Sequence, residues 1–230
     1  MNWKQLISAK RFGMEEFHEE RQENRSEFQR DYDRLIFSAP FRRLQNKTQV
    51  FPLPGSVFVH NRLTHSLEVA SVGRSLGDDV AKALLERHPE LQDSFLPEIG
   101  SIVSAACLAH DLGNPPFGHS GEKAISTFFS EGKGVRLKEK QPNGEQLSPM
   151  EWEDLTHFEG NANAFRILTH QFEGRRKGGF VLTYTTLASI VKYPFSSSLA
   201  GTKSKFGFFV SEEESFQKIA TELGLTLLNE

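Results

Sequence analysis

Apolar residues recur at steps of three and four along most of this chain, and alternation with a period of two is nearly absent. Steps of three and four place side chains on one face of an α-helix, whereas a period of two is typical of a half-buried strand. No internal repeat of fixed spacing is visible. The sequence therefore predicts an all-α fold, a mostly helical bundle with long loops.

The helical pattern is clearest in the middle of the chain. In segment 63–85, the residues Val72, Leu76 and Val80 mark the face that we expect to be buried, and His65 lies on the same face. Ser120 and the prolines and glycines before it mark further helix boundaries. The segments expected to be helical are 63–85, 99–109, 120–129, 158–172, 185–192 and 213–223.

The remaining segments are more polar. Segment 15–43 is dense in charge and predicts solvated surface helices that end before Pro40. Segment 131–153 is rich in Gly, Lys, Glu and Pro with little periodicity, so we expect an exposed excursion there. We expect residues 1–60 to form an N-terminal helical segment with a substrate loop, and residues 61–230 to form the core.

Composition excludes several classes of protein. With 37% hydrophobic and 25% charged residues, the chain is typical of a globular domain, neither disordered nor membrane-embedded. A formal charge of -3 gives no global reason to bind nucleic acid. Cys107 is the single cysteine, which excludes a disulfide framework and a cysteine-based zinc site. Residues 1–17 lack the apolar run of a signal peptide, so we expect a cytoplasmic protein without membrane contact.

Two histidines on the expected apolar faces need partners. His65 and His110 come from different helices, and Asp111 follows His110 directly. Imidazole and carboxylate groups suit first-row divalent metals, although a lone inward histidine is more often a hydrogen-bonded core residue. The run 110–122 combines prolines and glycines with polar side chains, which favours a rigid loop that positions them. Glu122 alone is explained equally well as a first-turn helix carboxylate.

Several segments together resemble the deoxyguanosinetriphosphate triphosphohydrolases of the HD-domain phosphohydrolase superfamily. The resemblance rests first on NRLTHSLE at 61–68 and HDLGNPPFGH at 110–119. It continues in FRRLQNKTQVF at 41–51 and HFEGNA at 157–162, and in the short segments at 179–184 and 192–194, so it spans essentially all 230 residues. The chain resembles the N-terminal portion of that family.

The resemblance implies a metal-dependent enzyme. It assigns His65, His110 and Asp111 as ligands of a divalent metal, Mg or Mn, and leaves other first-row metals open. The family's fourth ligand, a later aspartate, has no matching position in this chain. The implied reaction hydrolyses a deoxynucleoside triphosphate, with dGTP as the expected substrate, to the deoxynucleoside and inorganic triphosphate. The family also forms ring-like or stacked homo-oligomers.

The same resemblance suggests roles for the other polar residues. His119 is expected to act as the acid and base, with Glu122 orienting its ring. Arg62 is expected on phosphate and Gln49 on the 3' hydroxyl of the deoxyribose. His157 and Asn114 are further candidates for contacts with phosphate or with the residues that hold the metal.

Two other functions remain open. The metal site can act on another nucleotide, such as a monophosphate, a cyclic nucleotide or a guanosine polyphosphate. Alternatively, the chain is a non-catalytic regulatory module that binds nucleotides or single-stranded nucleic acid. Local anion patches for that role would come from Arg42, Arg43 and Lys47, and from residues 175–177.

Overall fold

The computed structural model is helical throughout the part of the chain that it describes. It describes residues 2–16, 25–47, 61–139, 144–174, 177–200 and 205–226. The α-helices are α1 (Trp3–Leu6), α2 (Glu27–Ile36), α3 (Ala39–Arg43), α4 (Arg62–Arg87), α5 (Ile99–Ala109), α6 (His119–Ser130), α7 (Pro149–Thr156), α8 (Gly160–Thr169), α9 (Tyr184–Ile190) and α10 (Glu213–Leu223). Short 3-10 helices are η1 (Leu44–Asn46), η2 (Pro89–Leu91), η3 (Leu96–Glu98), η4 (Lys133–Lys138), η5 (Ser197–Leu199) and η6 (Val210–Glu212).

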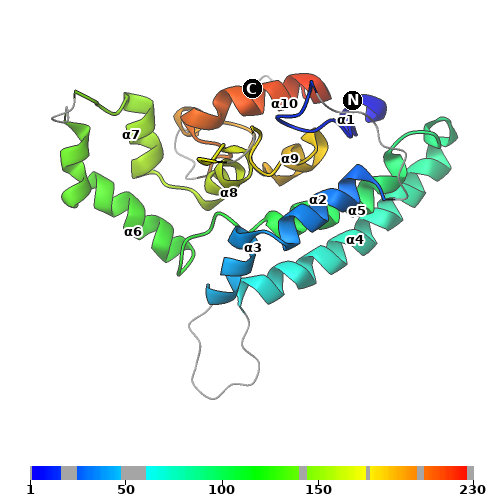
Figure 1. The fold of residues 1–230 in the computed structure, drawn as a ribbon, viewed down its shortest axis with the longest axis horizontal. Helices are drawn as coiled ribbons and strands as arrows, with labels where there is room; N and C mark the ends of the chain where they lie inside the picture. Colours follow the sequence, from blue (N-terminus) through cyan, green and yellow to red (C-terminus); the bar gives the residue numbers. More distant parts are fainter. Residues whose placement is uncertain are drawn as a thin grey trace, which may run out of the picture.

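The all-α prediction is confirmed, because within these ranges extended backbone pairs only as two isolated bridges. Helices α4 and α5 lie side by side, and α2 packs along α5 (Figure 1). On the opposite side, α9 contacts both α5 and α10, while α6 and α7 form an arm at one end (Figure 1). None of the helices in the described ranges has both the length and the apolar character that a bilayer span requires.

The contact between α4 and α5 is made by small residues. The buried positions of α4 include Ser66, Ala70, Gly73, Gly77 and Ala81. A methyl group added at Gly77 would lie 2.7 Å from the Cα of a glycine in α5, so the two backbones approach closely. Such an approach is possible only where side chains are absent or short.

The predicted buried face of this helix is therefore wrong. Val72 and Leu76 are each 60% exposed, and Val80 is 51% exposed. Val72, Leu76 and Val80 lie on the outer face because the positions of α4 that meet α5 are occupied by Gly, Ala and Ser. The most apolar face of α4 is therefore not its buried face. The close approach of the two backbones determines which face of α4 packs against α5.

Other boundaries differ locally from the expectations. Helix α7 begins inside the predicted excursion 131–153 and extends beyond it to Thr156. It starts with a capping box, in which Ser148 and Glu151 each accept a hydrogen bond from the other's backbone N–H group. Pro40 lies in the first turn of α3, where its missing N–H costs nothing, so it begins a helix there. The expected division near residue 60 falls next to 48–60, which lies outside the described residues.

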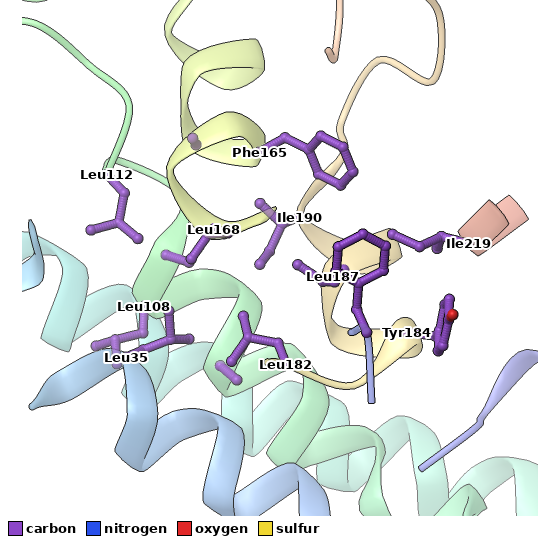
Figure 2. Packing of buried hydrophobic residues seen from close by; sticks show 14 of the residues in the cluster. Leu35, Leu108, Leu112, Phe165, Leu168, Leu182, Tyr184, Leu187, Ile190 and Ile219 are labelled. Atoms are coloured by element: carbon purple, nitrogen blue, oxygen red, sulfur yellow. The ribbon is translucent and has the colours of Figure 1, made fainter. Parts of the chain in front are cut away.

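One main hydrophobic cluster joins α2, α5, α8, α9 and α10 (Figure 2). Aromatic rings contribute to it, as Phe208 stacks on Phe216 with ring centroids 4.5 Å apart. The residues labelled in Figure 2 are Leu35, Leu108, Leu112, Phe165, Leu168, Leu182, Tyr184, Leu187, Ile190 and Ile219.

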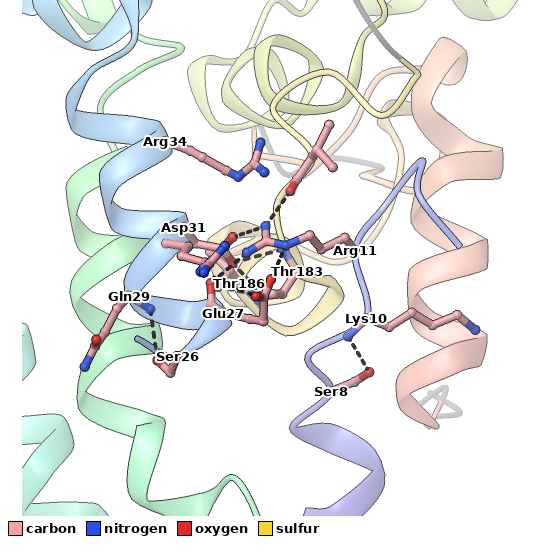
Figure 3. A network of polar contacts seen from close by, with 12 residues as sticks. Ser8, Lys10, Arg11, Ser26, Glu27, Gln29, Asp31, Arg34, Thr183 and Thr186 are labelled. Atoms are coloured by element: carbon pink, nitrogen blue, oxygen red, sulfur yellow. Dashed lines mark hydrogen bonds and ion pairs between the residues drawn. The ribbon is translucent and has the colours of Figure 1, made fainter. Parts of the chain in front are cut away.

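A buried polar network ties the N-terminal segment to this core (Figure 3). Arg11 donates through Nη1 to Oδ1 of Asp31 at 2.7 Å and also pairs with Glu27. The other oxygen of Asp31 accepts from the backbone N–H and the hydroxyl of Thr183. Segment 2–16, helix α2 and the start of α9 are thus held together at one point.

Candidate metal centre

Two neighbouring helices bring His65, His110 and Asp111 together. His65 lies in the first turn of α4, whereas His110 and Asp111 follow the last residue of α5. One potential ligand atom from each residue lies within 4.8 Å of the other two. The two imidazole rings meet edge to face with centroids 5.2 Å apart. His65 and His110 are thus far apart in sequence but are brought together by the packing of α4 against α5.

The orientation of His110 suits a ligand. Its Nδ1 lies 2.7 Å from the carbonyl oxygen of Cys107, so Nδ1–H donates there and Nε2 carries the free lone pair. Nε2 is 3.4 Å from Oδ1 of Asp111. Metal-binding histidines commonly donate their second N–H to a backbone carbonyl in this way, which sets the tautomer and the ring orientation.

Both oxygens of Asp111 already accept hydrogen bonds. Oδ2 accepts from Nη1 of Arg62 at 2.7 Å, and Oδ1 accepts from Nδ2 of Asn114 at 2.5 Å. Arg62 is itself buried, and its Nε has no hydrogen-bond partner among the described residues. The donor set of two imidazole nitrogens and one carboxylate therefore fits a first-row divalent metal, with its carboxylate held by neighbouring side chains.

The loop after Asp111 is tied down along its length. Lys47 donates through Nζ to the carbonyl of Asn114 at 2.8 Å, and Asn163 donates to the carbonyl of Gly113 at 2.8 Å. Phe117 has φ of 67°, in the left-handed region that side chains rarely adopt. Strain of this kind persists where the surroundings over-determine the backbone, as at functional sites.

The end of this loop sets the start of α6. Gly118 is the N-cap with φ of 56°, and the helix begins at His119 without a side-chain cap. The prediction that Ser120 caps this helix is therefore wrong, because Gly118, with its positive φ, makes the turn two residues earlier than a serine cap at 120 requires.

His119 and Glu122 form a second polar unit. His119 donates from Nδ1 to Oε2 of Glu122 at 2.8 Å, while the imidazole itself is 85% exposed. Oε1 of Glu122 accepts from the backbone N–H of Gly160 at 3.0 Å. Burial raises the pKa of Glu122, but the bonds from His119 and Gly160 and the charge of Lys205 outweigh it, so the pKa lies below its usual range.

The remaining sequence candidates lie elsewhere. His157 follows α7, and its Nδ1 is 3.2 Å from Oε1 of Glu153 in the same helix; the described contacts do not link it to the three clustered residues. Gln49 lies outside the described residues, as do Arg175 and Arg176 of the expected basic patch.

Two lysines lie near the site although the local sequence does not indicate this. Lys47 was visible only as part of a basic surface patch, yet it reaches the loop beside Asp111. Burial lowers its pKa, and the charge of Arg62 lowers it further. Lys205 contacts Glu122 from a distant part of the chain, and no local pattern around it indicates that contact.

Comparison with known proteins agrees with this geometry. The model of the HD domain family matches residues 62–179, which contain all three clustered residues. A deoxyguanosinetriphosphate triphosphohydrolase-like protein of Synechocystis sp. is 46% identical, over 98% of this chain and 52% of its own length. A protein of Pseudomonas aeruginosa with the same description is 45% identical, over 100% and 51%.

A deoxyguanosinetriphosphate triphosphohydrolase of Yersinia enterocolitica is 36% identical, over 100% of this chain and 50% of its own length. The chain thus spans about half the length of the curated relatives it matches. Their similarity extends over the N-terminal segment, the three clustered residues and the C-terminal helices alike. With about half of its residues inside the matching domain, and His65, His110 and Asp111 gathered there, the chain belongs to the HD domain family.

Proposed function

We propose that this chain carries the metal-binding and proton-transfer groups of a deoxynucleoside triphosphate triphosphohydrolase. The expected substrate is dGTP, and the products are the deoxynucleoside and inorganic triphosphate. The observation that carries the proposal is the gathering of His65, His110 and Asp111 within 4.8 Å, beside a buried arginine. The names of the similar proteins support the substrate class.

The ion that His65, His110 and Asp111 would hold is Mn or Mg. Two imidazole nitrogens favour Mn, because Mg prefers an all-oxygen set. When bound, such an ion supplies Lewis-acid chemistry at a phosphate oxygen. Cys107 contributes only through its carbonyl, which orients His110.

Two cationic side chains lie near Asp111, where they could bind the phosphate chain of the substrate. Arg62 uses Nη1 on Asp111, and its second terminal nitrogen, Nη2, lies beside Gly118 in the loop that follows Asp111. Lys47 lies close enough to Arg62 for their charges to interact. We assign both to phosphate contacts, Arg62 as in the resemblance and Lys47 as an addition to it. Asn114 then acts on Asp111 and not on substrate.

Proton transfer falls to His119 in this proposal. Water adds to the α-phosphorus, the bond from that phosphorus to the 5' oxygen breaks, and the leaving oxygen takes up a proton. Because Nδ1 of His119 is held by Glu122, Nε2 is the nitrogen that faces solvent and can pass a proton. Gln49 is proposed for the 3' hydroxyl, and His157 for a phosphate contact. A homo-oligomer and a cytoplasmic location stay predictions.

Product analysis tests the proposal directly. The purified chain is incubated with dGTP and Mn, phosphate products are separated, and bound metal is measured in the same sample. The Yersinia enterocolitica relative, whose name states this activity, serves at its full length as the positive control. We expect deoxyguanosine and inorganic triphosphate in equal amounts. Release of orthophosphate or diphosphate indicates a different nucleotide hydrolase, and bound metal without any product indicates a binding module.

A further inference from the structure

Lys205 places one ammonium group between two carboxylates beside His119. Its Nζ donates to Oε1 of Glu159 at 2.8 Å and lies 3.5 Å from Oε2 of Glu122. Lys205 precedes η6, and a small cluster that includes Phe206, Phe209 and Ala162 holds this part of the chain against α8. A group remote in sequence thus reaches the carboxylate that holds the imidazole.

Both carboxylates are fixed by the start of α8. Glu159 is the N-cap, and its Oε2 accepts from the backbone N–H groups of Asn161 and Ala162. Glu122 accepts from the N–H of Gly160, the first residue of the same helix. Neither group can turn away without giving up a backbone hydrogen bond. The two negative charges are therefore held near each other by the fold.

Like charges held together favour protonation of one carboxylate unless a cation offsets them. Burial lowers the pKa of Lys205, but the bond and charge of Glu159 and the charge of Glu122 raise it above its usual range. Lys205 therefore remains an ammonium under ordinary conditions. Its charge is one of the causes that keep the pKa of Glu122 low.

The other charged groups around α6 are directed elsewhere. On α7, Glu151 bonds to Ser148 at the cap, Glu153 lies beside His157, and Asp154 accepts from Ser197 and from the Val210 N–H. On η4, the ammonium of Lys138 lies over the Trp152 ring. Among the described residues, the charged groups in contact with Glu122 are thus His119 and Lys205, and Glu159 lies on the other side of Lys205.

We propose that Lys205 is a positioning residue of the His119–Glu122 pair: its ammonium offsets Glu159, so that the Glu122 carboxylate stays ionised and holds Nδ1 of His119. The proposal rests on the proposed function in that it takes His119 as the proton-transfer group. Lys205 touches neither the imidazole nor the clustered metal-binding residues in the described contacts, so it acts through Glu122.

The test compares Lys205→Met and Lys205→Arg with the unchanged chain. Lys10→Met is the matched control, because Lys10 also pairs with a carboxylate, Glu222, far from the site. Two readouts are taken: the pH dependence of kcat and kcat/KM for dGTP hydrolysis, and the pH titration of the Glu122 carboxyl carbon by NMR.

In Lys205→Met we expect the pKa of Glu122 to rise by about one unit, because the loss of a neighbouring positive charge makes the ionised carboxylate less favourable. The midpoint of the acidic limb of the kcat profile should rise by the same amount. Activity then returns at higher pH. Lys205→Arg should restore both curves, and Lys10→Met should leave both unchanged. A Lys205→Met variant whose two curves superimpose on those of the unchanged chain overturns the proposal.

Glu159→Gln provides an opposite test that keeps the oxygen acceptor at the helix cap. When this negative charge is removed, Glu122 is the carboxylate that the ammonium of Lys205 still stabilises. The pKa of Glu122 should therefore fall. An upward shift, or no shift, contradicts the proposal even if Lys205→Met does not fold. If the unchanged chain forms no triphosphate, the proposed function fails, whereas the NMR titration still decides the role of Lys205.

Discussion

Arg62 and Asp111 form an ion pair across 2.7 Å, with only 7% of each side chain exposed. Arg62 begins α4 and Asp111 follows α5, so the pair joins the two helices at the metal centre. A charge buried in this way depends on its partner, because little water can replace it. Binding of a cation beside Asp111 would supply a second partner for the same carboxylate.

Replacing Arg62 should therefore produce a metal-dependent defect. We expect Arg62→Met to lower the free energy of unfolding by about 3 kcal/mol, as measured by urea denaturation. Added Mn should stabilise this variant more than the unchanged chain, because the ion takes over the charge of Arg62. Arg87→Met, at the exposed end of α4, is the control. An equal response to Mn in all three proteins contradicts the expectation.

Two histidine variants should separate metal binding from proton transfer. His110→Ala removes a proposed ligand, so bound metal and turnover should fall together. His119→Ala should retain the metal and lower kcat by about 10² to 10⁴ fold. Metal content and kcat are measured on the same preparations. Equal loss of metal in both variants would show that the two roles are not separate.

The two faces of α4 should respond in opposite ways to substitution. Gly77→Ala places a methyl group 2.7 Å from the Gly100 Cα, so we expect a loss of about 1 to 3 kcal/mol despite the better helix propensity of alanine. Leu76→Ala, one residue away on the exposed face, should change stability by less than about 0.5 kcal/mol. Urea denaturation measures both, and a larger effect at Leu76 would contradict the packing described.

Glu15 should make stability depend on pH in the acidic range. Burial raises its pKa, but hydrogen bonds from Lys218 and Tyr184 outweigh this and lower the pKa from 4.5 to about 2. A carboxylate with a depressed pKa stabilises the fold above its unfolded pKa, and that contribution is lost as pH falls toward the folded value.

We expect Glu15→Gln to cost about 1 to 2 kcal/mol at pH 7, allowing for partial exposure to solvent. The difference from the unchanged chain should shrink as pH falls below about 4.5. Unfolding in urea between pH 7 and pH 3 measures it, with Glu86→Gln on the exposed side of α4 as the control. A difference that stays constant across this range would rule out Glu15 as its source.

Much of the fold could be predicted because helical spacing is a local property. Segments 99–109 and 213–223 match α5 and α10 residue for residue. Which face of a helix is buried is not local, however, and Val72 and Leu76 point outward because glycines in two helices allow a close approach. Apolar spacing identified the helix at 63–85 correctly and misassigned its inner surface.

The candidate site divides in the same way. His65, His110 and Asp111 lie in recognisable local patterns, and the structure brings them together. Lys205 could not be found, because its contacts with Glu122 and Glu159 depend on how distant segments pack. The role of Arg62 toward Asp111 likewise follows from helix packing, since a sequence pattern indicates a cation but not its partner.

The close contact of α4 and α5 also sets the distance between two of the proposed metal ligands. His65 belongs to one side of this seam and His110 to the other, so any slip of one helix along its neighbour changes their separation. One residue of slip is about 1.5 Å, whereas metal–ligand distances tolerate only about 0.2 Å. Mutations at the glycine contacts lie several turns from the histidines. They can nevertheless lower the affinity of the site for the metal ion, although they change no ligand.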